Sequence, residues 1–88
     1  MAKIVIIFAP SVIKSLKKYD SRLIADLQDK LIRFQDRDSH ESLKVHKLHG
    51  RMKDKYSFSI NYQYRVVFSW DEHGHAVIEG FGTHDLYE

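Results

Sequence analysis

The residues in the second half of the chain whose types suit catalysis are an arginine, two histidines and a tyrosine. Arg65 stands within the aromatic and β-branched run 64–68, so packing should hold its guanidinium partly in place. A guanidinium held in this way can grip a phosphate through two parallel hydrogen bonds. The alternative is a salt bridge to an acidic residue such as Glu79.

His84 and Tyr87 follow the last predicted strand. An imidazole can take or give a proton near neutral pH, and a phenol can donate a hydrogen bond to a nucleobase or stack on it. With an arginine on the phosphate, such a pair could cleave RNA, because the 2′-hydroxyl is a built-in nucleophile and no metal is needed. The alternative is a capping segment whose Leu86 and Tyr87 close the core.

Positive charge is concentrated just before these residues. Residues 43–70 contain six Lys and Arg residues and one Asp, whereas residues 71–88 contain five acidic residues and no Lys or Arg. Basic side chains beside a sheet favour phosphate binding, since neutralising phosphates releases counterions. The RNA-binding residues predicted on this basis are Lys47, His49, Arg51, Lys53 and Lys55. The alternative is an ordinary solvated basic loop.

The periodicity of apolar residues predicts the elements that position these groups. Residues 3–8 form a short apolar strand, and Pro10 suits the first turn of a helix of about ten residues. Asp20 or Ser21 can cap a second amphipathic helix that ends near residues 35–37. From Tyr56 onward the period changes to 2, which predicts strands over 56–60, 64–70 and 75–81. The expected fold is α+β, with a helical hairpin packed on one face of an antiparallel meander.

Length and composition exclude several classes of protein. A chain of 88 residues predicts a single domain, 1–88. The absence of cysteine excludes disulfides, thiolate metal sites and a cysteine nucleophile. The apolar run 4–9 is too short for a signal peptide or a membrane span, so a cytoplasmic protein that does not bind membranes is expected. Two histidine pairs, His46 with His49 and His73 with His75, are only weak evidence for a zinc site. We expect no metal or other cofactor.

Four segments of the sequence together resemble a known family. They are Lys47-Leu48-His49-Gly50, residues 56–60, residues 64–68 and the ending 82–87, Gly-Thr-His-Asp-Leu-Tyr. This combination is similar to the RelE/ParE toxin superfamily of bacterial type II toxin-antitoxin systems, and the resemblance covers nearly the whole chain. The Gly-Thr-His ending resembles the RelE and YafQ ribonuclease branch more than the ParE branch, which poisons gyrase.

The resemblance implies roles for individual residues. Arg65 matches the strand arginine that holds the scissile phosphate, and His84 matches a position where YafQ-like toxins have a catalytic histidine and RelE has an arginine. Tyr87 matches the terminal aromatic residue, with a shorter spacing from position 84, and His46 aligns with a further histidine of YafQ-like toxins. Serines 57 and 59 stand where RelE has catalytic lysines, so the chemistry here would have to depend on histidine.

The resemblance therefore implies a metal-independent, ribosome-dependent endoribonuclease that cleaves mRNA by attack of the 2′-hydroxyl on the adjacent phosphate. Arg65, His46, His84 and Tyr87 are the expected catalytic residues. The expected partners are mRNA in the ribosomal A site, rRNA and a cognate antitoxin that masks the basic face. The alternative is a ParE-like topoisomerase poison or a non-catalytic module that binds an antitoxin, and the serines at 57 and 59 keep this alternative open.

Overall fold

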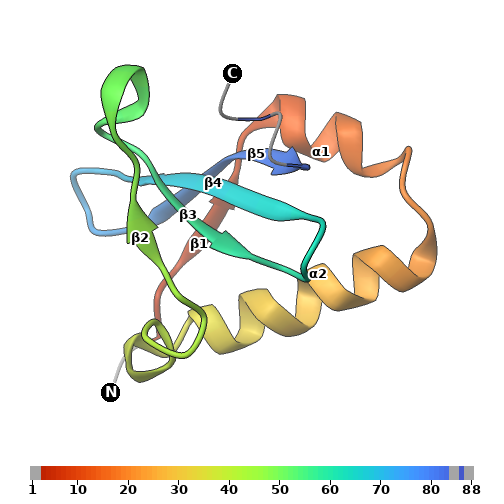
Figure 1. Ribbon diagram of the computed structural model, residues 1–88, viewed down its shortest axis with the longest axis horizontal. Helices are drawn as coiled ribbons and strands as arrows, with labels where there is room; N and C mark the ends of the chain where they lie inside the picture. The colour runs from red at the N-terminus through yellow and green to blue at the C-terminus, as the bar shows by residue number, and fades with distance from the viewer. Residues whose placement is uncertain (1–2, 84–85, 87–88) are drawn as a thin grey trace.

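The computed structural model describes residues 3–83 and 86, which form two α-helices, two short 3-10 helices and a five-stranded sheet (Figure 1). The helices are α1 (Pro10–Leu16), α2 (Ser21–Phe34), η1 (Arg37–Ser39) and η2 (Gly50–Met52). The strands are β1 (Ile6–Phe8), β2 (His46–Lys47), β3 (Tyr56–Ser59), β4 (Arg65–Trp70) and β5 (Ala76–Gly82). The predicted α+β fold is confirmed.

The start of α2 follows from its capping residue. The Asp20 side chain accepts a hydrogen bond from the backbone N–H of Leu23 at 2.8 Å, which satisfies one of the unpaired donors of the first turn. The first helix is shorter than predicted and ends at Leu16. Beyond it, Lys18 and Tyr19 donate to carbonyls only three residues back, at 3.1 and 3.3 Å. This tighter turn reverses the chain toward α2 and lets the Tyr19 ring pack on Phe81.

The strand order in the sheet is β1-β5-β4-β3-β2. The three-stranded antiparallel meander β3-β4-β5 is confirmed, and β1 pairs in parallel with β5 at one edge. Sequence periodicity missed β2 at the other edge, because its two residues, His46 and Lys47, are too few to show an alternation. This short strand pairs with β3 and so fixes His46 beside Ser57.

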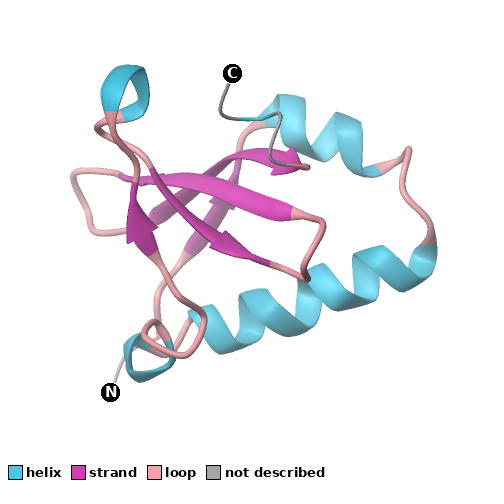
Figure 2. Cartoon of the chain, viewed as in Figure 1, coloured by secondary structure: helices cyan, strands magenta, loops and turns pink. Residues whose placement is uncertain are grey.

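The helices cover one face of the sheet (Figure 2), and the core lies between the two. Phe34 at the end of α2 is fully buried, and its ring lies 4.9 Å from the rings of both Phe58 and Phe68. Inward side chains on the central strands alternate with outward ones, as a strand periodicity of 2 requires. Within residues 3–83 and 86, no helix is long and apolar enough to cross a membrane.

Candidate nucleic-acid interface

The sheet face that points away from the helices, which we call the open face, carries two of the predicted site residues, Arg65 and His46. Phe58, Val66 and Phe68 belong to the core, so their neighbours on β3 and β4 point to the open face. These outward residues are Ser57, Ser59, Arg65, Val67 and Ser69. His46 pairs directly with Ser57, and Arg65 pairs with Ser59. The register therefore places both residues on the same face.

Arg65 is half-buried at the start of β4, between Ser59 on β3 and Gly82 on β5. Its Nη1 donates a hydrogen bond to the Ser59 Oγ at 3.0 Å. The other partner considered from the sequence, Glu79, is instead paired with Lys55. Among residues 3–83 and 86, no carboxylate forms an ion pair with Arg65. Within the described residues, the guanidinium is therefore oriented by a neutral group, the Ser59 hydroxyl.

His46 is exposed on β2, and its orientation is set by the turn before the strand. Its Nδ1 lies 2.8 Å from the carbonyl oxygen of Lys44. A carbonyl oxygen can only accept, so Nδ1 carries the proton in this hydrogen bond. The neutral imidazole then keeps Nε2 as its basic nitrogen. Lys44 has a φ of 59°, which places this non-glycine residue in the left-handed region.

The two serines that replace the family lysines differ in environment. Ser59 accepts the hydrogen bond from Arg65, so it helps to orient the candidate phosphate-binding group. Ser57 is fully buried, although it lies on the open face. A lysine at position 57 would lack the room to extend toward RNA in this packing. The sequence could not reveal this burial, because the alternation of β3 predicts an exposed polar face.

Lys55, directly before β3, differs from the other predicted RNA-binding residues because it already forms an ion pair with a carboxylate of β5. Its Nζ lies 2.7 and 2.6 Å from the two carboxylate oxygens of Glu79, and both side chains are one-third exposed. Partial burial alone would raise the pKa of Glu79. The hydrogen bonds from Lys55 and Ser69 and the charge of Lys55 outweigh burial and lower it. Lys55 is therefore a weaker phosphate ligand than its charge suggests.

The remaining predicted RNA-binding residues are exposed around the β2–β3 loop: Lys47, His49, Arg51 and Lys53. Gly50 has a φ of 68°, and this left-handed conformation explains the glycine of the Lys-Leu-x-Gly segment. In Figure 1 the loop rises beyond one end of the sheet. Arg65 lies at the other end, because β3 begins next to this loop and pairs with Arg65 through its last residue. The basic loop and Arg65 are separated by the length of β3.

His84 and Tyr87 lie outside the residues that the structure describes, so their predicted roles stay predictions. Leu86, which is described, packs over the two glycines of β5. A Cβ on Gly80 would lie 3.5 Å from the Leu86 side chain, and a Cβ on Gly82 would lie 3.4 Å from it. The space that the two glycines leave on β5 is therefore occupied by the Leu86 side chain.

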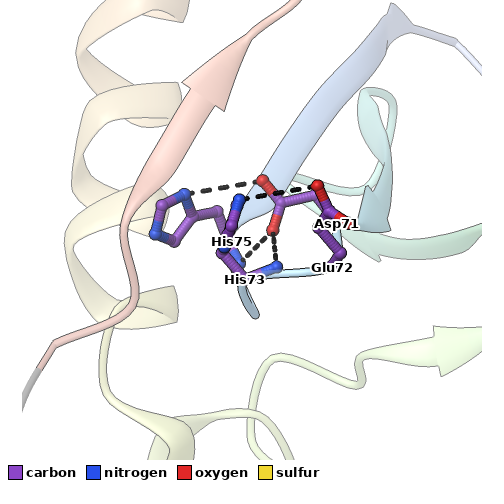
Figure 3. A network of polar contacts seen from close by, with 4 residues as sticks. All are labelled: Asp71, Glu72, His73 and His75. Atoms are coloured by element: carbon purple, nitrogen blue, oxygen red, sulfur yellow. Dashed lines mark hydrogen bonds and ion pairs between the residues drawn. The ribbon is translucent and has the colours of Figure 1, made fainter.

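The histidines of the Asp-Glu-His-Gly-His segment belong to the β4–β5 turn (Figure 3). Arg65 begins β4, so this turn lies at the opposite end of that strand. One Asp71 oxygen accepts the backbone N–H groups of His73 and His75, both at 2.8 Å. Desolvation would raise the pKa of Asp71, but these hydrogen bonds and the charges of the two histidines lower it. Within 3–83 and 86, no three His, Asp or Glu side chains gather into a metal site. Asp71 and the two histidines instead organise the turn.

A pocket that the sequence analysis missed adjoins Arg65. It has a volume of about 450 Å³ and lies between α2, the turn before β2 and the β3–β4 turn. Three cationic side chains line it, together with Ser59 and the almost fully exposed Tyr62. Its residues come from three segments far apart in the sequence, so no local pattern marks it. The only local signal was an aromatic residue at the centre of a predicted turn.

The fold is similar to that of solved structures of bacterial toxin-antitoxin complexes. YoeB in the YoeB-YefM complex from Staphylococcus aureus matches with a TM-score of 0.71 and 23% identity over 94% of this chain and 99% of that chain. The E. coli DinJ-YafQ complex matches with a TM-score of 0.72 and 16% identity over 96% of each chain. The RelBE2 complex from Mycobacterium tuberculosis matches with a TM-score of 0.68 and 20% identity, over 92% and 98%.

The family model described as "RelE-like toxin of type II toxin-antitoxin system HigB" matches residues 10–81. The chain belongs to this family of HigB-like, RelE-like toxins, and the predicted membership of the RelE superfamily is confirmed. No curated protein gives a significant match to the sequence.

Proposed function

We propose that this toxin is a metal-independent, ribosome-dependent endoribonuclease that cleaves mRNA. The 2′-hydroxyl attacks the adjacent phosphate, the O2′–P bond forms and the P–O5′ bond breaks. One histidine of the pair His46 and His84 removes the proton from the 2′-oxygen, and the other protonates the leaving 5′-oxygen. Arg65 stabilises the charge that develops on the phosphate, and Tyr87 positions a base by stacking.

The observation that carries this proposal is that Arg65 and His46 lie on the same face of the sheet, each with its side chain oriented by a hydrogen bond. The guanidinium is oriented by Ser59, and His46 keeps Nε2 as its basic nitrogen because Nδ1 contacts the Lys44 carbonyl. The two residues are two strands and two positions apart. With strands about 4.8 Å apart and about 3.4 Å per residue, their Cα atoms lie about 12 Å apart. Both side chains could then reach one phosphodiester between them.

The basic loop supports binding of a large RNA. Lys47, His49, Arg51 and Lys53 are exposed at the end of the sheet away from Arg65, where they can contact rRNA or more distant mRNA phosphates. Lys55 contributes less, because Glu79 neutralises it. The three similar structures are toxin–antitoxin complexes, so we also propose that a cognate antitoxin binds this toxin and blocks the open face.

Induced expression of wild type and Arg65→Ala in cells, with mapping of mRNA 5′ ends, tests the proposal. Removing a donor that stabilises transition-state charge costs about 100- to 1000-fold in rate, so Arg65→Ala should abolish growth arrest and the new 5′ ends within codons. Arg22→Ala is the matched control, because Arg22 is exposed in the first turn of α2. It should remain toxic.

The same experiment separates the competing functions. DNA breaks without new mRNA ends would indicate a topoisomerase poison, and neither product would indicate a module that only binds its antitoxin. Undiminished cleavage by Arg65→Ala would refute the assigned role of Arg65. Circular dichroism of the purified variant should show an intact fold, because only one hydrogen bond of Arg65 to a described side chain, that to Ser59, is lost.

A further inference from the structure

The pocket beside Arg65 is connected to both candidate catalytic residues of the described chain. Ser59 lines it and accepts the hydrogen bond from Arg65. Lys44 also lines it, and its carbonyl contacts the His46 Nδ1. The pocket therefore borders the residues that orient both Arg65 and His46.

The charge of the pocket suits phosphate. Lys30, Arg33 and Lys44 line it, and no acidic side chain of the described residues does. Asp29 approaches Lys30 and Arg33 from outside at 3.9 and 3.8 Å, and its side chain is 61% exposed. Long, exposed ion pairs of this kind contribute little, so both cations remain available to an anion.

Tyr62 supplies an aromatic surface at the rim of the pocket. It is 96% exposed, the highest exposure among the large exposed hydrophobic residues of the described chain. The Asn61 side chain accepts the backbone N–H groups of Gln63 and Tyr64 at 2.9 and 2.8 Å, so the turn that presents Tyr62 is held in one conformation. An exposed ring on an ordered turn can stack on a nucleobase without ordering a loop first.

We propose that this pocket binds the nucleotide next to the scissile phosphate, with Tyr62 stacked on its base and Lys30, Arg33 and Lys44 on its phosphates. The inference rests on the proposed ribonuclease function and names the substrate contacts of that site. It assigns RNA binding to α2, a helix on which the sequence analysis named no functional residue.

The test uses ribosomes programmed with an mRNA whose A-site codon is 2′-O-methylated, so that the toxin binds without cutting. Affinity is measured for wild type, Tyr62→Ala and Tyr62→Trp. Stacking contributes about 1–3 kcal/mol per base, so Tyr62→Ala should weaken binding by about 5- to 150-fold. Tyr62→Trp, which keeps an aromatic ring for stacking, should bind like wild type. A merely structural role of Tyr62 would not predict this result.

The double variant Lys30→Ala/Arg33→Ala should also bind more weakly. Its plot of log K against log salt should be less steep than that of wild type, by about 0.7 for each lost phosphate contact. Lys17→Ala/Lys18→Ala, exposed after α1, is the charge-matched control and should bind like wild type. If wild type neither binds programmed ribosomes nor cleaves the mRNA on them, the proposed function itself fails. If wild type binds and both pocket variants bind equally well, or the control loses as much, only the pocket assignment is overturned.

Discussion

Replacing Glu79 by glutamine should make the sheet less stable and the protein a better RNA binder. The side chains of Glu79 and Lys55 are each one-third exposed, so their ion pair is intermediate between exposed and buried pairs. Fully exposed ion pairs contribute about 0.2–1 kcal/mol to stability. Removing one partner of a buried pair costs about 3–5 kcal/mol. Glutamine keeps the shape and one acceptor oxygen for Lys55. The expected loss in the free energy of unfolding is therefore about 1 kcal/mol, or about 4–8 °C in Tm for a domain of this size.

The pH dependence of this effect has a defined sign. The folded pKa of Glu79 lies below its ordinary value of 4.5, so the stabilisation is fully present above pH 4.5 and is lost as pH falls through the folded value. Urea unfolding, followed by the fluorescence of the single tryptophan, Trp70, measures the difference between wild type and Glu79→Gln at pH 7 and below pH 4. An equal difference at both pH values, or none at pH 7, would refute the reasoning.

The binding arm uses the same variant. Without the carboxylate, the ammonium of Lys55 is available to an RNA phosphate, so the affinity of Glu79→Gln for programmed ribosomes should rise and the salt dependence should steepen by about 0.7. Glu72→Gln is the matched control, because Glu72 is exposed in the β4–β5 turn and its ion pair with His73 is long and exposed. Equal affinity for wild type and Glu79→Gln would show that Lys55 does not reach RNA.

Two further predictions concern local structure. Asp20→Ala removes the cap of α2 and should cost about 1 kcal/mol in urea unfolding, whereas Ser21→Ala, next to it, should cost less. Lys44→Gly should stabilise the protein by up to about 1 kcal/mol, because glycine adopts the observed φ of 59° without the steric cost of a side chain. A lower midpoint for Lys44→Gly would mean that the lysine side chain stabilises the turn.

The sequence predicted elements whose periodicity extends over several residues. The apolar stripe of α2, with Leu27, Leu31 and Phe34, and the alternation around Arg65 both correspond to real faces. The site was less predictable where it depends on pairing. β2 has no period to detect, yet its pairing puts His46 beside Ser57.

Cross-strand side-chain partners were equally hidden. Lys55 reaches Glu79 across β4, and the register shift between Val67 and Phe68 helps to set where the residues of β5 lie along that strand. From the sequence, a salt bridge to an acidic residue such as Glu79 was the alternative to phosphate binding for Arg65. Only the register shows that Lys55 takes that partner and leaves Arg65 with Ser59.

The parallel pairing of β1 with β5 has a consequence for the time at which the sheet is completed. Ile6 pairs with Ala76, so the first strand cannot pair until a residue seventy positions later has been synthesised. Pairing over such a separation carries a large loop-closure entropy and forms late. Arg65 also lies next to Gly82 of that last strand. During synthesis, a chain whose β5 has not yet emerged from the ribosome lacks both the partner of β1 and the strand beside Arg65, so the sheet and its open face can be completed only after β5 has emerged.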